Sequence, residues 1–107
     1  MKVQTLSEMF GGWFVGNFEP SILKTEAFEA CVKRYAKGER EPCHYQLTSI
    51  EITVIVSGRA RLGAQVFETN DVILIEPGEE ADFEALEDTV LLAVKTPSIP
   101  EDKRLVK

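Results

Sequence analysis

The sequence predicts an all-β fold, a sandwich or closed barrel in a single domain with no substantial helix. About eight short segments alternate between apolar and polar residues, and turn residues separate them at intervals of about 8–12 residues. No segment has the 3.6-residue apolar period of a helix. At 107 residues the chain suits one domain.

The expected elements divide the domain 1–107 into three parts. Residues 1–26 form a short N-terminal arm with edge strands, residues 27–97 form the core, and residues 98–107 form a Pro-rich, charged tail. The strands are expected at 25–36, 43–47, 50–57, 59–62, 64–68, 71–75, 82–86 and 89–95. The last two are expected to form a hairpin through Glu87 and Asp88, and a polar turn covers 37–42.

The N-terminal arm concentrates aromatic residues in a Gly-rich segment, with Trp13, Phe14 and Phe18 between Gly11 and Pro20. One interpretation is an aromatic wall of a binding pocket, where glycines allow close backbone approach. The other is an edge strand whose aromatic side chains cover the barrel or a partner subunit.

Charge and composition exclude several classes of protein. The net charge is −6, with 18 acidic and 12 basic residues, whereas a nucleic-acid binder needs a basic face. No apolar run approaches the ~18 residues of a membrane-spanning helix, and we expect a cytoplasmic protein. Cys31 and Cys43 make no disulfide framework.

The candidate catalytic or metal-binding residues lie around His44, the only histidine. His44 and Gln46 share a face of their strand because side chains alternate, and Glu51 lies inward on the next strand with Thr53 and Ile55. If the two strands pair, an imidazole, an amide and a carboxylate converge. Such a group suits a metal site or acid–base chemistry.

This segment resembles the first motif of the cupins, G-x5-H-x-H-x3/4-E-x6-G. The chain reads Gly38-x5-His44-x-Gln46-x4-Glu51-x6-Gly58, so only the second histidine differs. The resemblance implies a double-stranded β-helix, the cupin jelly-roll barrel. It also implies a divalent first-row metal held by His44, Gln46 and Glu51, with a metal-free site as the alternative.

The second cupin motif is matched in part. The pattern G-x5-P-x-G-x2-H-x3-N falls on Asn70-x5-Glu76-Pro77-Gly78-x2-Ala81-x3-Ala85, where the Pro-Gly turn is present. The position of the fourth metal ligand is Ala81. Two of the four ligands of the family are therefore kept, one is replaced by a weak amide ligand, and one is absent.

The resemblance leaves three functions open. The first is binding of a small molecule, a carbohydrate or sugar-nucleotide, near His44, Gln46 and Glu51 with Trp13 and Phe14 beside it. The second is an enzyme, metal-assisted or a metal-free isomerase or epimerase, in which His44 and Glu51 act with Tyr35 as the acid. The third is a non-catalytic, dimeric interaction module.

The strand at 50–57 also predicts a partner. Its face away from the cavity carries only β-branched residues, namely Ile50, Ile52, Val54 and Val56. Full burial of such side chains stabilises by about 1.5–3 kcal/mol each. Because cupin-like barrels commonly pack such sheets together, we expect a homodimer through this face.

Overall fold

The computed structural model describes all 107 residues and contains eleven strands and two 3-10 turns. The turns are η1 (Leu6–Glu8) and η2 (Phe10–Gly12), and no helix has the length and apolarity needed to cross a membrane. The strands are β1 (Trp13–Gly16), β2 (Leu23–Lys24), β3 (Glu29–Tyr35), β4 (Arg40–Gln46), β5 (Ile50–Ser57), β6 (Arg59–Leu62), β7 (Gln65–Glu68), β8 (Val72–Ile75), β9 (Ala81–Ala85), β10 (Thr89–Thr96) and β11 (Lys103–Leu105).

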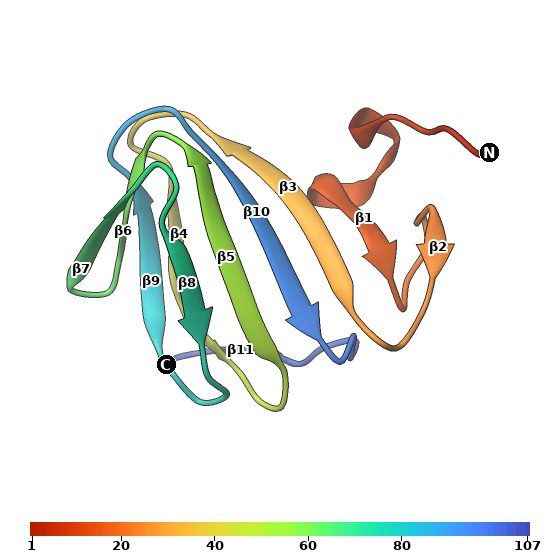
Figure 1. The fold of residues 1–107 in the computed structure, drawn as a ribbon. Helices are drawn as coiled ribbons and strands as arrows, with labels where there is room; N and C mark the ends of the chain where they lie inside the picture. Colours follow the sequence, from red (N-terminus) through yellow and green to blue (C-terminus); the bar gives the residue numbers. More distant parts are fainter.

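These strands form two facing sheets. One has six strands in the order β2-β1-β3-β10-β5-β8, and the other has five in the order β11-β4-β9-β6-β7. Figure 1 shows the long strands β3, β10 and β5 side by side, with β1 and β2 extending the sheet away from the barrel. The predicted all-β, double-stranded β-helix with an N-terminal arm is confirmed.

Three connections differ from the sequence prediction. The strands of His44 and Glu51 do not pair, because β4 and β5 lie in opposite sheets. Strands β9 and β10 likewise lie in different sheets rather than forming a hairpin. The expected tail contributes β11, whose Lys103 pairs with Gln46. Alternation along a strand fixes which side chains share a face, but it does not fix which sheet the strand joins.

The apolar core lies between the two sheets, at the end of the barrel where Ile55 pairs with Leu91. Its buried members come from both sheets, and Ile55, Ala60 and Ala85 have no exposed surface. The others are Cys31, Phe83, Leu91 and Ala93, with the Tyr35 ring packed 4.5 Å from that of Phe83. This end of the barrel is therefore closed by side chains.

The outer face of the six-stranded sheet is apolar and exposed. On β5, Ile52 is 39% and Val56 50% exposed, and on the neighbouring β8, Leu74 is 57% exposed. Alternation thus places Ile50, Ile52, Val54 and Val56 of β5 away from the cavity, as the sequence predicts. No other part of the chain covers them.

Candidate functional site

A cavity of about 220 Å³ lies between the two sheets beside the apolar core. Its polar lining comes from opposite walls. The six-stranded sheet contributes Lys33, Tyr35, Glu51 and Lys95, and the five-stranded sheet contributes Glu41, His44 and Gln46. The predicted trio of His44, Gln46 and Glu51 therefore lines one cavity, but across the barrel rather than on paired strands.

A β-bulge in β4 shapes the five-stranded wall. Glu41 pairs with Phe83 and His44 pairs with Ala81, so the register shifts by one residue between them. Residues three apart on a regular strand face opposite sides, but one extra residue brings both Glu41 and His44 inward. Alternation counted from the sequence misses Glu41 for this reason, and the second half of the turn expected at 37–42 belongs to β4.

His44 is oriented by its own backbone. Its Nδ1 lies 3.1 Å from the carbonyl oxygen of Pro42. A carbonyl oxygen only accepts hydrogen bonds, so Nδ1 carries the hydrogen. The neutral ring then keeps its lone pair on Nε2, as a proton acceptor requires.

Glu41 forms a charged cluster with β3. Lys33 Nζ lies 3.5 Å from its Oε1. Burial acts to raise the pKa of Glu41, but the charges of Lys33 and Lys103, the hydrogen bond from Tyr35 and the nearby His44 together lower it. Burial, followed by the charge of Glu41, raises the pKa of Tyr35 well above its usual range. Glu41 is thus an ionised carboxylate and Tyr35 a neutral hydrogen-bond donor.

Glu51 belongs to a separate cluster. It accepts a 2.9 Å hydrogen bond from Thr53 Oγ1, and Lys95 Nζ lies 4.0 Å from its other oxygen. The ammonium groups of Lys95 and Lys33 lie 4.9 and 5.7 Å from the ring centre of Trp13. Trp13 therefore lines the cavity as a support for cations, a favourable arrangement because the face of an aromatic ring attracts positive charge.

Gln46 is a buried polar side chain of this wall without a partner. The residue is 3% exposed, and neither its Oε1 nor its Nε2 has a hydrogen bond. A buried amide without partners costs about 1–3 kcal/mol of stability. Such a group requires an explanation, and a ligand that supplies the missing hydrogen bonds is one.

Comparison with known proteins supports the architecture. No protein-family model and no curated protein matches the sequence. An uncharacterised Klebsiella pneumoniae protein with a double-stranded β-helix domain is similar in structure, with 16% identity, a TM-score of 0.72, and coverage of 98% of this chain and 91% of that one. The DMSP lyase DddQ from Ruegeria pomeroyi has a TM-score of 0.72 at 15% identity over 88% of this chain and 49% of its own.

A third similar structure carries the name of the superfamily. It is a sugar phosphate isomerase from a cupin superfamily, from Silicibacter pomeroyi, with a TM-score of 0.60 and 19% identity over 65% of this chain and 50% of its own. This chain has the cupin fold. It spans about half the length of the lyase and of the isomerase. The two carry different activities on one fold, so the likeness fixes the architecture and not the chemistry.

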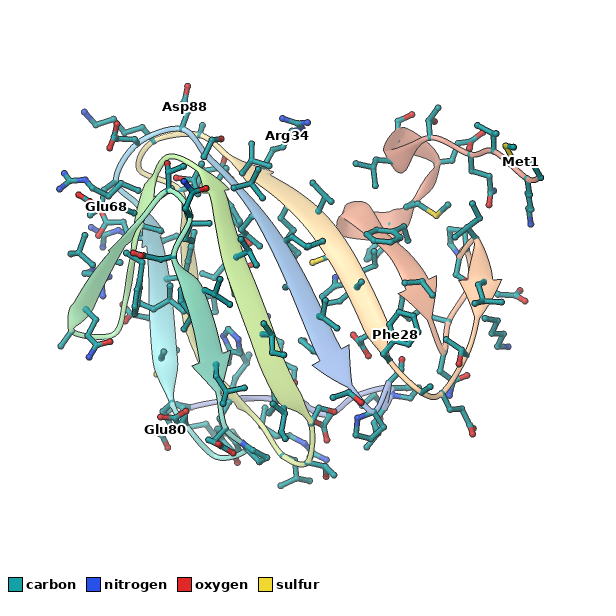
Figure 2. The ribbon with its side chains drawn as sticks, viewed as in Figure 1. Met1, Phe28, Arg34, Glu68, Glu80 and Asp88 are labelled. Atoms are coloured by element: carbon teal, nitrogen blue, oxygen red, sulfur yellow. The ribbon has the colours of Figure 1, made fainter.

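The residues at the cupin metal positions do not fit a metal centre. No group of three or more His, Cys, Asp or Glu side chains is arranged to hold a metal ion. Ala81, at the position of the fourth ligand, pairs directly with His44 and so faces the same cavity without a donor atom. Its neighbour Glu80 lies in the exposed turn before β9 (Figure 2). Glu51 is already engaged by Thr53 and Lys95.

Two of the three remaining expected site residues line the cavity, and the third, Phe14, is half-buried on β1 outside it. The two that line it are Trp13 and Tyr35. Sequence reasoning passed over Lys33 and Lys95 as site residues. A signal for both exists, because alternation places Lys33 with Cys31 and Tyr35, and Lys95 with Leu91 and Ala93.

Proposed function

We propose that this cupin-fold protein binds a small, neutral, hydroxyl-rich molecule such as a carbohydrate in the cavity beside Gln46. The observation that carries the proposal is the buried Gln46 amide, in which donor and acceptor both lack a partner. An amide presents one acceptor and two donor hydrogens on a single plane. A pair of neighbouring hydroxyl groups can satisfy both at once.

The charges around the cavity support a neutral ligand. Lys33 is paired with Glu41 and Lys95 with Glu51, and the remaining lining lysine, Lys103, acts through its charge on Glu41. An anion or a cation entering the cavity competes with these pairs, whereas the unsatisfied group is an uncharged amide. We therefore expect hydrogen bonds to Gln46 to determine which ligand the cavity selects.

The volume of the cavity limits the size of the ligand. Its volume of about 220 Å³ lies below the roughly 300–1,000 Å³ of pockets that enclose drug-sized ligands. We infer a group of the size of one sugar ring here rather than a complete sugar-nucleotide.

The test is Gln46→Met, which keeps the length of the side chain and removes both polar atoms. We expect loss of binding to a panel of monosaccharides and polyols followed by ligand-observed NMR. We also expect the free energy of unfolding to rise by about 1–3 kcal/mol, because the buried polar group is gone. Gln65→Met, at an exposed position on β7, is the matched control and should change neither. Wild-type protein that binds no member of the panel, or a Gln46→Met protein that is less stable, would refute the proposal.

A second candidate function is proton transfer, as in an isomerase or epimerase. His44 is favoured as the base because Nδ1–H is committed to Pro42, which leaves Nε2 as the acceptor. Tyr35 is a neutral hydrogen-bond donor beside Glu41, so Glu41 is the carboxylate that supports this proposed acid. Glu51 instead accepts a hydrogen bond from Thr53 on the six-stranded sheet.

Deuterium exchange distinguishes an enzyme from a binding protein. Each sugar of the panel is incubated with protein in heavy water, and deuterium at carbon is followed by NMR. An isomerase incorporates deuterium, and His44→Gln abolishes the incorporation while binding persists. Binding without incorporation by the wild-type protein rejects this second candidate.

We also propose that two copies pair through the outer face of the six-stranded sheet. The exposed side chains Ile52, Val56 and Leu74 support this, since apolar surface that no other part of the chain covers favours association. The same face is the binding surface in the third interpretation, a non-catalytic dimeric interaction module.

A further inference from the structure

We propose that the ligand extends from the cavity into a second chamber, where a flat ring with apolar faces and a polar rim binds. This inference rests on the proposed function, because it adds a subsite to the same ligand. The chamber has a volume of about 350 Å³ and is built by the N-terminal arm and the segment before β11.

The two spaces are adjacent and share a wall. Five residues line both, namely Trp13, Glu29, Gln46, Lys95 and Lys103. The unpartnered amide of Gln46 therefore belongs to the wall that the two spaces share. One amide can bond to hydroxyl groups on both sides, since it offers two donors and an acceptor.

The arm supplies aromatic surface to the chamber. Phe18 lies edge-on to Trp13, with ring centres 6.3 Å apart and planes at 77°. Phe10 is 84% exposed and lines the same chamber. A large aromatic side chain left in water beside a chamber gains by contact with the apolar face of a ring.

Glycines hold the arm in place against β3. A Cβ at Gly12, which has φ 81°, would lie 2.1 Å from the carbonyl oxygen of Val32. A Cβ at Gly16 would lie 2.3 Å from the ring of Phe18. Any side chain at these positions collides, so the aromatic wall depends on close backbone contact that only glycine permits.

The opposite wall is fixed by Asp102, which is 6% exposed. Its carboxylate accepts hydrogen bonds from the backbone N–H groups of Thr48 at 3.0 Å and Ser49 at 2.9 Å. Burial acts to raise the pKa of Asp102, but these hydrogen bonds lower it on balance. Ser49 Oγ also donates to the carbonyl of Pro97 at 2.7 Å. The turn that follows Gln46 is thus tied to the C-terminal segment, and the chamber is formed before a ligand arrives.

The residues that line the second chamber indicate the chemical class of the group that binds there. Phe10, Phe18 and Ile99 offer apolar contact, while Asn17, Glu19 and Lys103 surround them with polar groups. A second sugar ring and an aryl substituent share the required chemistry, a flat apolar face joined to the polar ring in the inner cavity. The complete ligand is therefore a disaccharide or an aryl glycoside.

The experiment compares matched glycosides by calorimetry. The probes are methyl glycosides of common hexoses, the phenyl glycosides of the same sugars, and disaccharides with the same first ring. We expect the phenyl glycoside or the disaccharide to bind about tenfold more tightly than the methyl glycoside, equivalent to about 1.4 kcal/mol. Whichever of the two gains identifies the outer group as an aryl group or a sugar.

Variants then show which residues produce this gain in affinity. Phe10→Ala should remove it while affinity for the methyl glycoside stays unchanged, and Gln46→Met should abolish binding of every probe. Phe10 is exposed, so its replacement should leave the fold intact, and Phe18→Ala is the second variant. Phe28→Ala is the control, because Phe28 is 38% exposed, lies directly before β3 and lines neither space (Figure 2).

The outcomes separate the two proposals. If methyl and phenyl glycosides and disaccharides bind equally, or if Phe10→Ala keeps the gain, the second chamber is rejected and the inner site stands. If no probe binds, both proposals are overturned. Tight binding of phenyl glycosides that survives Gln46→Met would contradict a ligand shared between the two spaces.

Discussion

The two ends of the barrel interior are built by the same strands and have opposite characters. Paired residues of β5 and β10 form successive layers, first Ile55 with Leu91, then Thr53 with Ala93, then Glu51 with Lys95. The first layer is buried and apolar, and the last is a charged pair beside the cavity. In the middle layer Cys31 pairs with Ala93, and burial raises the pKa of Cys31 to about 11, so its thiol stays protonated at neutral pH.

The contrast shows how a small domain can separate stability from binding. The apolar end removes hydrocarbon from water, which is the main favourable term in folding. The polar end keeps an unsatisfied amide, which lowers stability, and it presents this amide and two charged clusters to a ligand. Substitutions should therefore differ in size and even in sign between the two ends, as Gln46→Met is expected to show.

The largest effect is expected at the apolar end. Ile55→Ala leaves a cavity among fully buried neighbours and should lower the free energy of unfolding by about 2–5 kcal/mol, measured in urea. Ile52→Ala is the matched control on the same strand, because Ile52 is 39% exposed on the other face. Equal losses in the two variants would contradict the apolar end as the principal core.

The next effect concerns the wall of the second chamber. Asp102→Asn should lower the free energy of unfolding by about 1–3 kcal/mol at neutral pH, because the charged acceptor for Thr48 and Ser49 is lost. The pKa of Asp102 is lowered in the folded state. Its stabilisation is therefore complete above the usual aspartate pKa of about 3.9 and disappears as the pH falls through the folded pKa.

Urea unfolding at neutral and acidic pH checks this expectation. The difference between wild type and Asp102→Asn should shrink on acidification. Glu80→Gln, in an exposed turn, serves as the control and should have little effect at either pH. A difference that is independent of pH would show that the carboxylate charge is not responsible.

A smaller effect is expected at the polar end from Glu41→Gln. The pair with Lys33 is partly exposed, so we expect a loss of at most about 1 kcal/mol, present above the usual glutamate pKa and lost in acid because the pKa of Glu41 is lowered. Urea unfolding at neutral and acidic pH measures this loss, and a difference between wild type and Glu41→Gln that does not shrink in acid would contradict a role for the carboxylate charge.

The smallest effect on the fold should come from the outer face. Ile52→Glu should leave the stability of the monomer almost unchanged but convert a dimer to a 12.0 kDa particle in light scattering at micromolar concentration. Val66→Glu, at a 50% exposed position on the other sheet, should leave the mass unchanged. A wild-type protein that already scatters as a 12.0 kDa particle would refute the proposed dimer.

The sequence by itself determined the fold class and the inward faces of most strands. Period-two alternation is local, so it placed Lys33 with Tyr35 and Glu51 with Thr53 without knowledge of the partners. The spacing from Gly38 to Gly58 added the resemblance to cupins, which the fold confirms. It also placed His44, Gln46 and Glu51 together, and all three line one cavity.

Only the tertiary structure decided which strands face one another and which groups meet. The assignment of β4 and β5 to opposite sheets, the bulge that turns Glu41 inward and the return of the C-terminal segment as β11 all depend on contacts between residues far apart in the sequence. Periodicity cannot report such contacts. For the same reason the sequence suggests an aromatic pocket wall from Trp13 and Phe18, but not that the segment near Asp102 completes the second chamber.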